Sequence, residues 1–432
     1  MNSEVKKFIE ENIDLIENEN FQEMFNLAHK KLSCAHALEL RGVLYSAGVC
    51  CNERSTSPNI LKHRIHQIKC YNVGFGDCFL CKNENTNSKM LIDCGTQNSF
   101  KNTDVTDDIY LELAQADEKN IMISHLHEDH YNGISLLLAT YPNLQIDNVY
   151  LPNYISYGSL ELYAAMVFYG KQDTDLTKVA RAVLTIPGIF ANNFSHYARI
   201  YFACEGKTIQ NNLCTFETIL PRKWFKRPCP IDNEKIREFC SRYLSILNIE
   251  TSTGEGNTIE VRIVSDNNIQ QGIDELLREY DNVDFPSISN SELEALKKAF
   301  EKHHNNMSLA FHEKSVCDFH NVLFWGDAEK ANIKYACDTY VRTYYGFIKI
   351  PHHGTKTHFY DKLPKAKFCA ISNGKYTGRE ITALYDVQYG DNTTFICSNN
   401  VNCEIDQHNC DCRSKKKNCA KCGFDLSYSV VL

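Results

Sequence analysis

Residues 121–130 of the chain read IMISHLHEDH. The first three residues are apolar and predict a short buried strand, which Ser124 ends. Four metal-ligating side chains follow directly: His125, His127, Asp129 and His130. Imidazole and carboxylate are the usual protein ligands of zinc and of harder divalent ions such as manganese. A strand that runs straight into such a loop predicts a metal site, and the simpler alternative is a polar loop rich in histidine.

The spacing of these ligands favours two ions over one. His125 and His127 can reach one ion from the loop, whereas Asp129 and His130 point elsewhere and can reach a second. Two neighbouring ions clamp the attacking and leaving groups of a hydrolytic displacement. We therefore expect a dinuclear hydrolytic centre.

The pattern HxHxDH after an apolar strand resembles the metallo-β-lactamase fold. Two further segments narrow the resemblance to the ComEC branch, which is named for the bacterial DNA-uptake channel. VGFGDC at residues 73–78, followed by MLIDCG at residues 90–95, is similar to the VGQGDA and ILIDGG motifs of that branch. Asp93 in the second segment matches a buried carboxylate near the metals in the family, and the alternative is a turn aspartate before Gly95.

Three later segments extend the resemblance in family order. NNMSL at residues 305–309, VLFWGD at 322–327 and IKIPHHGT at 348–355 are similar to the motifs NNxSL, LLLTGD and LKVPHHGS. The resemblance covers roughly residues 66–400 and leaves both ends of the chain unexplained. It implies a free-standing hydrolase module without the membrane channel of the ComEC protein.

The fold class that the resemblance implies is an α/β metallo-β-lactamase αββα sandwich, in which two sheets are flanked by helices. We place this hydrolase domain at residues 61–400, with a helical insertion at 222–304 where the family has only a short connection. Apolar residues at helical spacing predict a small helical module at residues 1–60, which contacts a protein partner or simply caps the main domain. Residues 401–432 form a Cys-rich tail.

The family pattern also implies a role for each ligand. His125 and His127 bind one ion, while Asp129, His130 and His353 bind the other, and Asp327 bridges the two. His352 then becomes a candidate for substrate binding or proton transfer. Asp129, Asp327 and His352 are the residues that we expect to act in catalysis.

One ligand position is unusual. The third histidine of the first ion corresponds to Asn305 or Asn306, as in the ComEC branch, although His303 and His304 lie just before and could reach the site. An asparagine oxygen is a harder ligand than an imidazole nitrogen. We therefore expect either zinc or manganese, with manganese slightly favoured.

A basic aromatic run, RKWFKR, opens the insertion at residues 222–227. Its cations can neutralise phosphates while its aromatic rings stack on bases, which predicts a substrate contact. The residues concerned are Arg222, Lys223, Trp224, Lys226 and Arg227. The simpler interpretation is a solvated loop bounded by Pro221 and Pro228.

The chain contains 20 cysteines, which predict reduced thiols and metal ligands in a long chain without a secretion signal. The spacing CAKCG in the tail is typical of a zinc knuckle. The candidate ligands of a structural zinc are Cys403, Cys410, Cys412, Cys419 and Cys422. The alternative is a thiol-rich tail that holds no metal.

Composition limits the function further. Hydrophobic residues make up 43% and charged residues 23%, with a net charge of -8, the profile of a soluble protein rather than a general nucleic-acid coat. No apolar run approaches the ~18 residues of a membrane span, and residues 1–7 lack the apolar core of a signal peptide. We expect no membrane association and a cytoplasmic location.

The function that these observations favour is metal-dependent hydrolysis of phosphodiester bonds, with a nucleic acid as the substrate. One alternative is a hydrolase of small molecules such as nucleotides, phosphocholine esters or lactones, which the acidic net charge supports. The other is a non-catalytic binding or effector module, in which the site only senses a ligand.

Overall fold

The chain divides into two compact units, each described here by itself. The first comprises residues 1–63 with 315–317, and the second comprises residues 64–314 with 318–432. The computed structural model describes residues 3–17, 24, 27–28, 31–32, 40, 64–97, 100–101, 103–170, 174–191, 194–222, 229–248, 258–262, 269–314, 321–372, 384–389, 393–397, 419–422 and 427–431.

The first unit opens with two short helices, α1 (Ser3–Glu11) and α2 (Ile13–Glu17). Val5 and Phe8 are one helical turn apart in α1, and both are buried in a small apolar cluster with Met24 and Leu40. This unit therefore has an apolar core of its own. The helix predicted at residues 35–47 lies outside the described residues, apart from Leu40.

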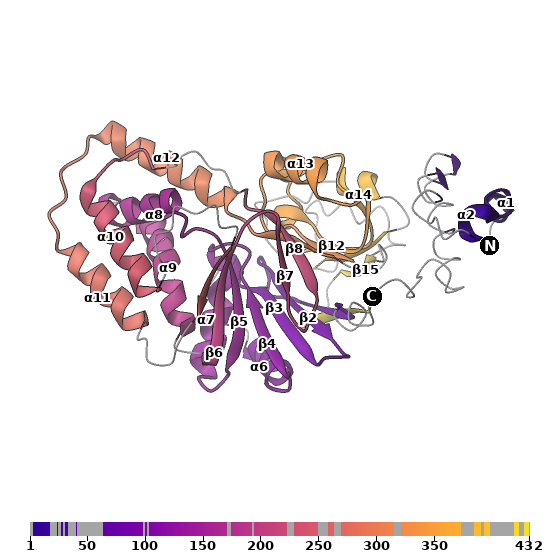
Figure 1. Cartoon of the computed structure of the whole chain (residues 1–432), viewed down its shortest axis with the longest axis horizontal. Coiled ribbons are helices and arrows are strands. Elements are labelled where there is room, and N and C mark those ends of the chain that lie inside the picture. Colours follow the sequence, from indigo (N-terminus) through magenta and orange to yellow (C-terminus); the bar gives the residue numbers. More distant parts are fainter. Residues whose placement is uncertain are drawn as a thin grey trace. The chain divides into compact units, whose positions relative to one another are not determined.

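The second unit contains two eight-stranded mixed sheets. The first sheet has the strand order β16-β1-β2-β3-β4-β5-β6-β9, of which β2 to β6 are labelled in Figure 1. Its strands in chain order are β1 (Gln67–Tyr71), β2 (Cys78–Asn83), β3 (Ser88–Cys94), β4 (Glu118–Met122), β5 (Ile146–Pro152), β6 (Phe194–Ala203), β9 (Thr258–Arg262) and β16 (Ser427–Val431). The strands from β3 to β6 are parallel, so their carboxyl ends lie at one edge of the sheet.

The second sheet has the strand order β15-β14-β13-β12-β11-β10-β8-β7. Its strands are β7 (Lys207–Gln210), β8 (Thr215–Leu220), β10 (Ala310–Glu313), β11 (Val322–Phe324), β12 (Tyr344–Lys349), β13 (Lys365–Ile371), β14 (Thr394–Cys397) and β15 (Cys419–Cys422). The strands from β11 to β15 are parallel. This parallel half again places several strand ends at one edge.

One apolar core lies between the sheets. Apolar side chains from both inner faces meet there, including Phe79 and Met90 of the first sheet and Phe324 and Phe347 of the second. Every residue of β3 and of β12 is buried, which is the pattern of strands covered on both faces. These strands therefore need a helical layer on their outer side.

Helices supply those outer layers. α6 (Thr103–Ala114) and α7 (Glu128–Thr140) pack on the first sheet, and α13 (Lys330–Thr339) and α14 (Leu384–Tyr389) pack on the second. Two mixed sheets flanked by helices are consistent with the expected αββα sandwich.

A helical layer, α8 to α12, extends the unit beside the first sheet (Figure 1). It comprises α8 (Tyr157–Tyr169), α9 (Thr174–Ala191), α10 (Glu234–Ile246), α11 (Ile269–Asp281) and α12 (Asn290–Asn306). The insertion differs from the expectation in two respects. It contains a strand, β9, which extends the first sheet, and its helices share one apolar cluster with α8 and α9, which precede residue 222.

Candidate metal centre

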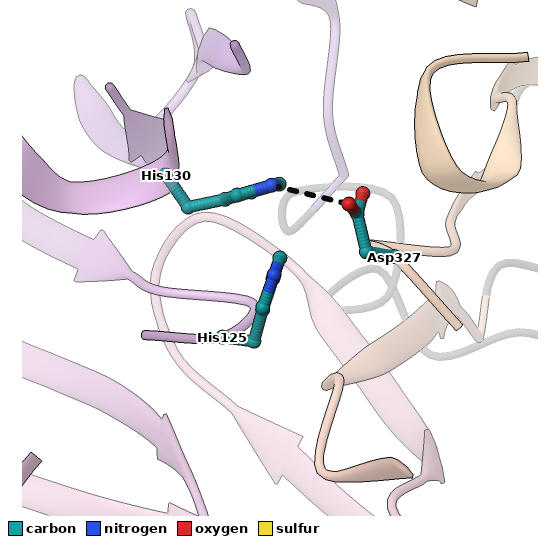
Figure 2. A group of neighbouring side chains, drawn as sticks. All are labelled: His125, His130 and Asp327. Atoms are coloured by element: carbon teal, nitrogen blue, oxygen red, sulfur yellow. Dashed lines mark ion pairs between the residues drawn. The ribbon is translucent and has the colours of Figure 1, made fainter. Parts of the chain in front are cut away.

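Six predicted ligands meet at the strand ends of the two sheets: His125, His127, Asp129, His130, Asp327 and His353. The loop after β4 and the start of α7 supply those from residues 125–130, whereas Asp327 follows β11 and His353 follows β12. In Figure 2 the rings of His125 and His130 both point toward the carboxylate of Asp327. The fold thus brings the ligand motif at residues 125–130 together with Asp327 and His353, which lie about 200 residues later in the chain.

Two glycines allow the backbone to close around the start of α7. A Cβ atom on Gly95 would lie 2.4 Å from the carbonyl oxygen of Glu128 and from the amide nitrogen of His130. A Cβ atom on Gly76 would lie 2.8 Å from the carbonyl oxygen of Asp129. Only glycine fits at such distances, so these two motif residues bring the loops of the first sheet directly against the ligands.

α7 begins at Glu128, within the ligand motif itself. Asp129 and His130 therefore lie in the first helical turn and not in a free loop. An acidic residue is favourable there because it faces the positive end of the helix dipole. The helix thus holds both ligands on a rigid element.

Asp93 orients His130 and does not itself face the centre. Its carboxylate accepts hydrogen bonds from the Ser124 amide and hydroxyl, each at 2.6 Å, and from Nδ1 of His130 at 2.9 Å. The backbone of Asp93 has a φ of 52°, and its side chain is buried. Because Nδ1 of His130 is directed to Asp93, Nε2 is the ring nitrogen that faces the centre.

The expected second ion has a matching group of donors. Nε2 of His130 lies 3.6 Å from Oδ2 of Asp327 and 3.9 Å from Oδ1 of Asp129. Nε2 of His353 lies 3.4 Å from Oδ2 of Asp327 and 3.3 Å from Oδ2 of Asp129. All four side chains point their donor atoms at one small volume.

His353 is held in the same way as His130. Its Nδ1 donates to the carbonyl oxygen of Ser372 at 2.8 Å, which leaves Nε2 as the lone-pair atom. The ring of Phe75 packs on it, with ring centroids 4.4 Å apart. Phe75 stands where the ComEC-like motif has glutamine, so an apolar ring supports this histidine.

Three histidines gather at the expected first ion. Nε2 of His125 lies 2.9 Å from Nδ1 of His127, and the ring of His304 lies 4.5 Å from that of His127. His304 lies in the last turn of α12, and its Nδ1 lies 3.0 Å from the hydroxyl of Tyr163 in α8. The third imidazole at this position therefore comes from the end of the inserted helix.

Of the two asparagines expected at that position, Asn306 makes its hydrogen bonds elsewhere. Nδ2 of Asn306 donates to the carbonyl oxygen of Lys302 at 2.7 Å, and its Oδ1 accepts from Asn332 at 2.8 Å. These bonds direct Asn306 toward α13. The side chain of Asn305 is outside the described residues.

Four imidazoles of the centre fall into two groups that differ in the direction of their pKa shift. Burial lowers the pKa of His125 and of His304, and neighbouring histidines lower it further. Burial also opposes the charged form of His130 and His353, but the surrounding carboxylates outweigh it and raise both pKa values, that of His353 to about 9. The first group is thus neutral, and the second lies in a negative environment.

The carboxylates show the complementary effect. Burial raises the pKa of Asp129 and of Asp327, but the neighbouring histidines outweigh it and hold both pKa values well below the ordinary range. The centre is therefore built to hold positive charge.

Sequence reasoning assigned no role to Lys349 and Asp77, although both lie within quoted motifs. The structure buries both at 1% side-chain exposure and joins them in an ion pair next to Asp327. The available signal was a charged residue inside the apolar run Ile348–Ile350, because a buried charge needs a partner.

His352 lies at the rim of the centre. Its Nδ1 is 3.4 Å from Oδ2 of Asp327, and its ring stacks on His358 with centroids 3.8 Å apart. Nε2 of His358 is 3.4 Å from Oε2 of Glu329. His352 remains partly accessible, with 17% side-chain exposure, whereas His353 is fully buried.

Only the first residue of the predicted substrate run is described. Arg222 is exposed, and its guanidinium lies 4.1 Å from the ring centre of Tyr335 in α13. The others, Lys223, Trp224, Lys226 and Arg227, lie outside the described residues. The same holds for Cys403, Cys410 and Cys412, while Cys419 and Cys422 are described only by their backbone, at the two ends of β15.

The donor chemistry fits divalent metal ions. Among the described residues, Nε2 of His130, His304 and His353 is buried and has no hydrogen-bond partner. Unsatisfied buried polar atoms are costly, and bound metal ions would satisfy these nitrogen atoms. The atoms of His125, His130 and Asp327, and those of Asp129, His130 and His353, lie within 4.8 Å of one another in each group.

Residues 71–190 match the family model of the metallo-beta-lactamase superfamily. Proteins of this superfamily are in general metal-dependent hydrolases, and residues 71–190 are similar to their domain. The match includes the HxHxDH segment but ends before His304, Asp327 and His353. No curated protein matches the chain.

Among the helices that the structure describes, none combines the length and the apolar character that crossing a membrane requires.

Proposed function

We propose that this protein hydrolyses phosphodiester bonds with two divalent metal ions, and that its substrate is a nucleic acid. The observation that carries the proposal is the convergence of buried donor atoms from both sheets and from α12, several of which have no other described partner. Such a set is costly to bury without a cation.

In this proposal each ion has its own three protein ligands. His125, His127 and His304 hold the first ion, and Asp129, His130 and His353 hold the second. Asp327 would contribute its carboxylate to both ions. Three imidazoles at the first ion favour zinc, which replaces the slight preference for manganese that an asparagine ligand suggested.

Two such ions, when bound, supply an activated water and polarise the scissile phosphate. The protein residues orient the ligands and hold their protons away from the centre. Asp93 and the Ser372 carbonyl keep a proton on Nδ1 of His130 and His353, so that each Nε2 stays free to bind. His352, at the exposed side of Asp327, is placed to contact substrate or to transfer a proton.

Two observations support a nucleic acid as the substrate. The motifs at residues 73–95 and 305–355 resemble the ComEC branch, which is linked with DNA degradation. The run at residues 222–227 adds four cations and two aromatic rings, and its exposed Arg222 lies against α13, the helix that follows Asp327.

The test is digestion of labelled single- and double-stranded DNA and RNA across a panel of zinc, manganese and magnesium, with Asp129→Ala as the inactive control. Degradation of a polymer that depends on metal and on Asp129 supports the proposal. If the wild-type protein leaves every polymer intact but cleaves a nitrophenyl phosphodiester, the substrate is a small molecule. If it does neither, the hydrolase assignment is wrong.

The contribution of the run can be separated from the chemistry. Replacing Arg222, Lys223, Lys226 and Arg227 with serine should weaken binding of long nucleic acid and flatten its salt dependence by roughly one unit of slope per lost phosphate contact. Cleavage of a small phosphodiester should hardly change. Equal loss of both activities would show that the run supports the site structurally.

A small-molecule hydrolase is the second candidate, and the net charge of -8 favours it because an acidic protein repels a long polyanion. The two candidates share the metal centre and differ in what the serine substitutions at residues 222–227 should change. Only the nucleic-acid candidate predicts steep salt dependence.

A further inference from the structure

Lys349 is a buried lysine in the middle of the second sheet. It is the last residue of β12, between Phe324 of β11 and Ala370 of β13. A lysine at such a position is rare unless its charge is paired. Burial opposes the charged form, but Asp77 and Asp327 outweigh it and raise the pKa of Lys349 above its ordinary value.

The ammonium of Lys349 joins the two sheets. Nζ makes a close ion pair with Oδ2 of Asp77, which lies in the loop between β1 and β2 of the first sheet. On its own sheet, Nζ donates to the carbonyl oxygen of Gly326 at 3.0 Å and lies 3.4 Å from Oδ1 of Asp327. One cation thus contacts both halves of the sandwich at the metal centre.

Asp77 lies behind the ligands of the second ion. Its Oδ2 is 3.6 Å from Nδ1 of His130, and its Oδ1 is 3.7 Å from Nδ1 of His353. The opposite nitrogen of each ring faces Asp129 and Asp327. Asp77 therefore lies on the Nδ1 side of the two rings, away from Asp129 and Asp327. Lys349 contacts both Asp77 and Asp327 and so connects the two sides.

The two oxygens of Asp327 have different neighbours. Oδ1 faces Lys349, whereas Oδ2 faces the rings of His130 and His353 at 3.6 and 3.4 Å. A carboxylate held in this way can offer only one oxygen to metal. If Oδ1 were released, the same carboxylate could rotate and chelate one ion with both oxygens.

We propose that Lys349 is a positioning residue of the metal centre, which holds Oδ1 of Asp327 so that this carboxylate bridges both ions through Oδ2 alone. The inference rests on the proposed function, in which Asp327 lies between two ions. Lys349 itself binds no metal and touches no substrate. Its partner Asp77 anchors the ammonium to the other sheet.

Charge and positioning have opposite consequences for metal binding. A cation near the ions repels them, so removing the ammonium would strengthen binding if charge alone mattered. Loss of a residue that orients a ligand typically weakens metal binding by about 10- to 100-fold. Positioning by Lys349 therefore predicts weaker binding despite the removal of a positive charge.

The experiment measures zinc stoichiometry and affinity in the full-length protein by chelator competition, together with the visible spectrum of the cobalt-substituted protein. Three variants are compared with wild type: Lys349→Met, the double variant Lys349→Met with Asp77→Asn, and Lys89→Met. Lys89 is the matched control, because it too is a lysine in a strand and has a low side-chain exposure of 10%. Its partner is Glu112, away from the centre.

We expect Lys349→Met to weaken the second zinc by about 10- to 100-fold and Lys89→Met to leave it unchanged. The cobalt absorption should also fall in Lys349→Met, because two oxygens from Asp327 raise the coordination number. The double variant leaves no unpaired carboxylate, so it should melt closer to wild type than Lys349→Met does. Its zinc affinity should nevertheless remain reduced.

Four results would overturn the inference. Wild-type zinc affinity in the double variant would show that Lys349 is only the counter-ion of Asp77. Stronger zinc binding in Lys349→Met would show that charge alone acts. If wild type binds two ions and the variants match it, only the role of Lys349 is wrong, whereas fewer than two ions in wild type would overturn the proposed function and the bridge together.

Discussion

His304 and His303 are neighbours in α12, yet the structure gives them different surroundings. Nε2 of His303 lies 2.9 Å from the hydroxyl of Ser159, and burial lowers its pKa to about 4. Nε2 of His304 has no hydrogen-bond partner among the described residues and lies beside His127. One ring is a satisfied core residue, and the other is free for an ion.

This pair provides a matched test of the first ion. We expect His304→Asn to lose one equivalent of zinc and to lower turnover by at least two orders of magnitude, because the proposed first ion keeps only two imidazoles. His303→Asn should keep both ions, since its ring serves packing. Metal analysis by mass spectrometry and steady-state kinetics measure the two effects.

If both variants kept two ions, His304 would not be a metal ligand. Equal metal loss in both variants would instead indicate that the end of α12 had unfolded, which circular dichroism would report.

The sequence was sufficient to single out the candidate ligands that lie in one short motif. His125, His127, Asp129 and His130 fall within six positions, and their spacing alone predicted a metal site. It was not sufficient to choose between His304 and the following asparagines. That choice depends on the phase of the last turn of α12, which the packing of α12 on α8 decides through contacts such as Tyr163–His304.

At the scale of elements, α8 holds the ligand that α12 carries. For Nε2 of His304 to bind an ion, Nδ1 must carry the proton and donate it to the Tyr163 oxygen, 3.0 Å away. We expect Tyr163→Phe to weaken the first zinc by about tenfold, because the ring loses the partner that fixes its tautomer. Tyr243→Phe is the control, since its hydroxyl bonds to the Leu184 carbonyl in the same helical layer. Zinc competition titrations compare the two, and similar affinities would contradict the role of Tyr163.

β10 contains a buried acid that should make stability depend on pH. Oε1 of Glu313 accepts from the Ile65 amide at 3.1 Å, and burial raises the pKa of Glu313 to about 8. The unfolded chain releases this proton near the ordinary value, while the folded chain keeps it until about pH 8. The contribution of Glu313 to folding is therefore complete at low pH and falls as pH rises through that interval.

Glu313→Gln should remove this dependence. We expect the variant to gain stability relative to wild type as pH rises from about 5 to 8, by on the order of a few kcal/mol. Urea denaturation of both proteins at a series of pH values measures the difference. A constant difference across the series would show that the carboxyl titrates normally.

Some elements were visible in the sequence and others were not. The apolar spacing of residues 234–247 and 291–302 predicted helices that correspond to α10 and α12. α11 was not predicted, although Ile273, Leu276, Leu277 and Tyr280 are buried at helical spacing. β9 was not predicted either, because a strand at the edge of a sheet has its partner far away in the sequence.

At the scale of the molecule, the division after residue 63 predicts that the second unit binds metal without the first. The first unit has its own apolar cluster, and the described ligands all lie in the second unit. We expect a chain that starts at Arg64 to bind two zinc ions and to melt within a few degrees of the full-length protein. Metal analysis and calorimetry provide the check. Loss of an ion would show that the first unit contributes to the centre.

The two sheets and their flanking helices could be anticipated because five motifs stand in family order. The arrangement of the centre could not, since the Lys349–Asp77 pair and the contact of His304 with His127 join segments from different layers. Such contacts have no local pattern in the sequence.

The order of the ligands along the chain has a consequence for how the protein is made. During synthesis, residues 125–130 emerge long before residues 304, 327 and 353, and domains fold as the chain appears. In the proposed centre, the early histidines would form an open site until the last of these leaves the ribosome, and an ion would exchange readily from it. Because the closed site forms only with folding, the ion it retains is selected at the end of that process. The metal found in the mature protein should therefore reflect the ions available where folding finishes, and not those that the nascent chain met first.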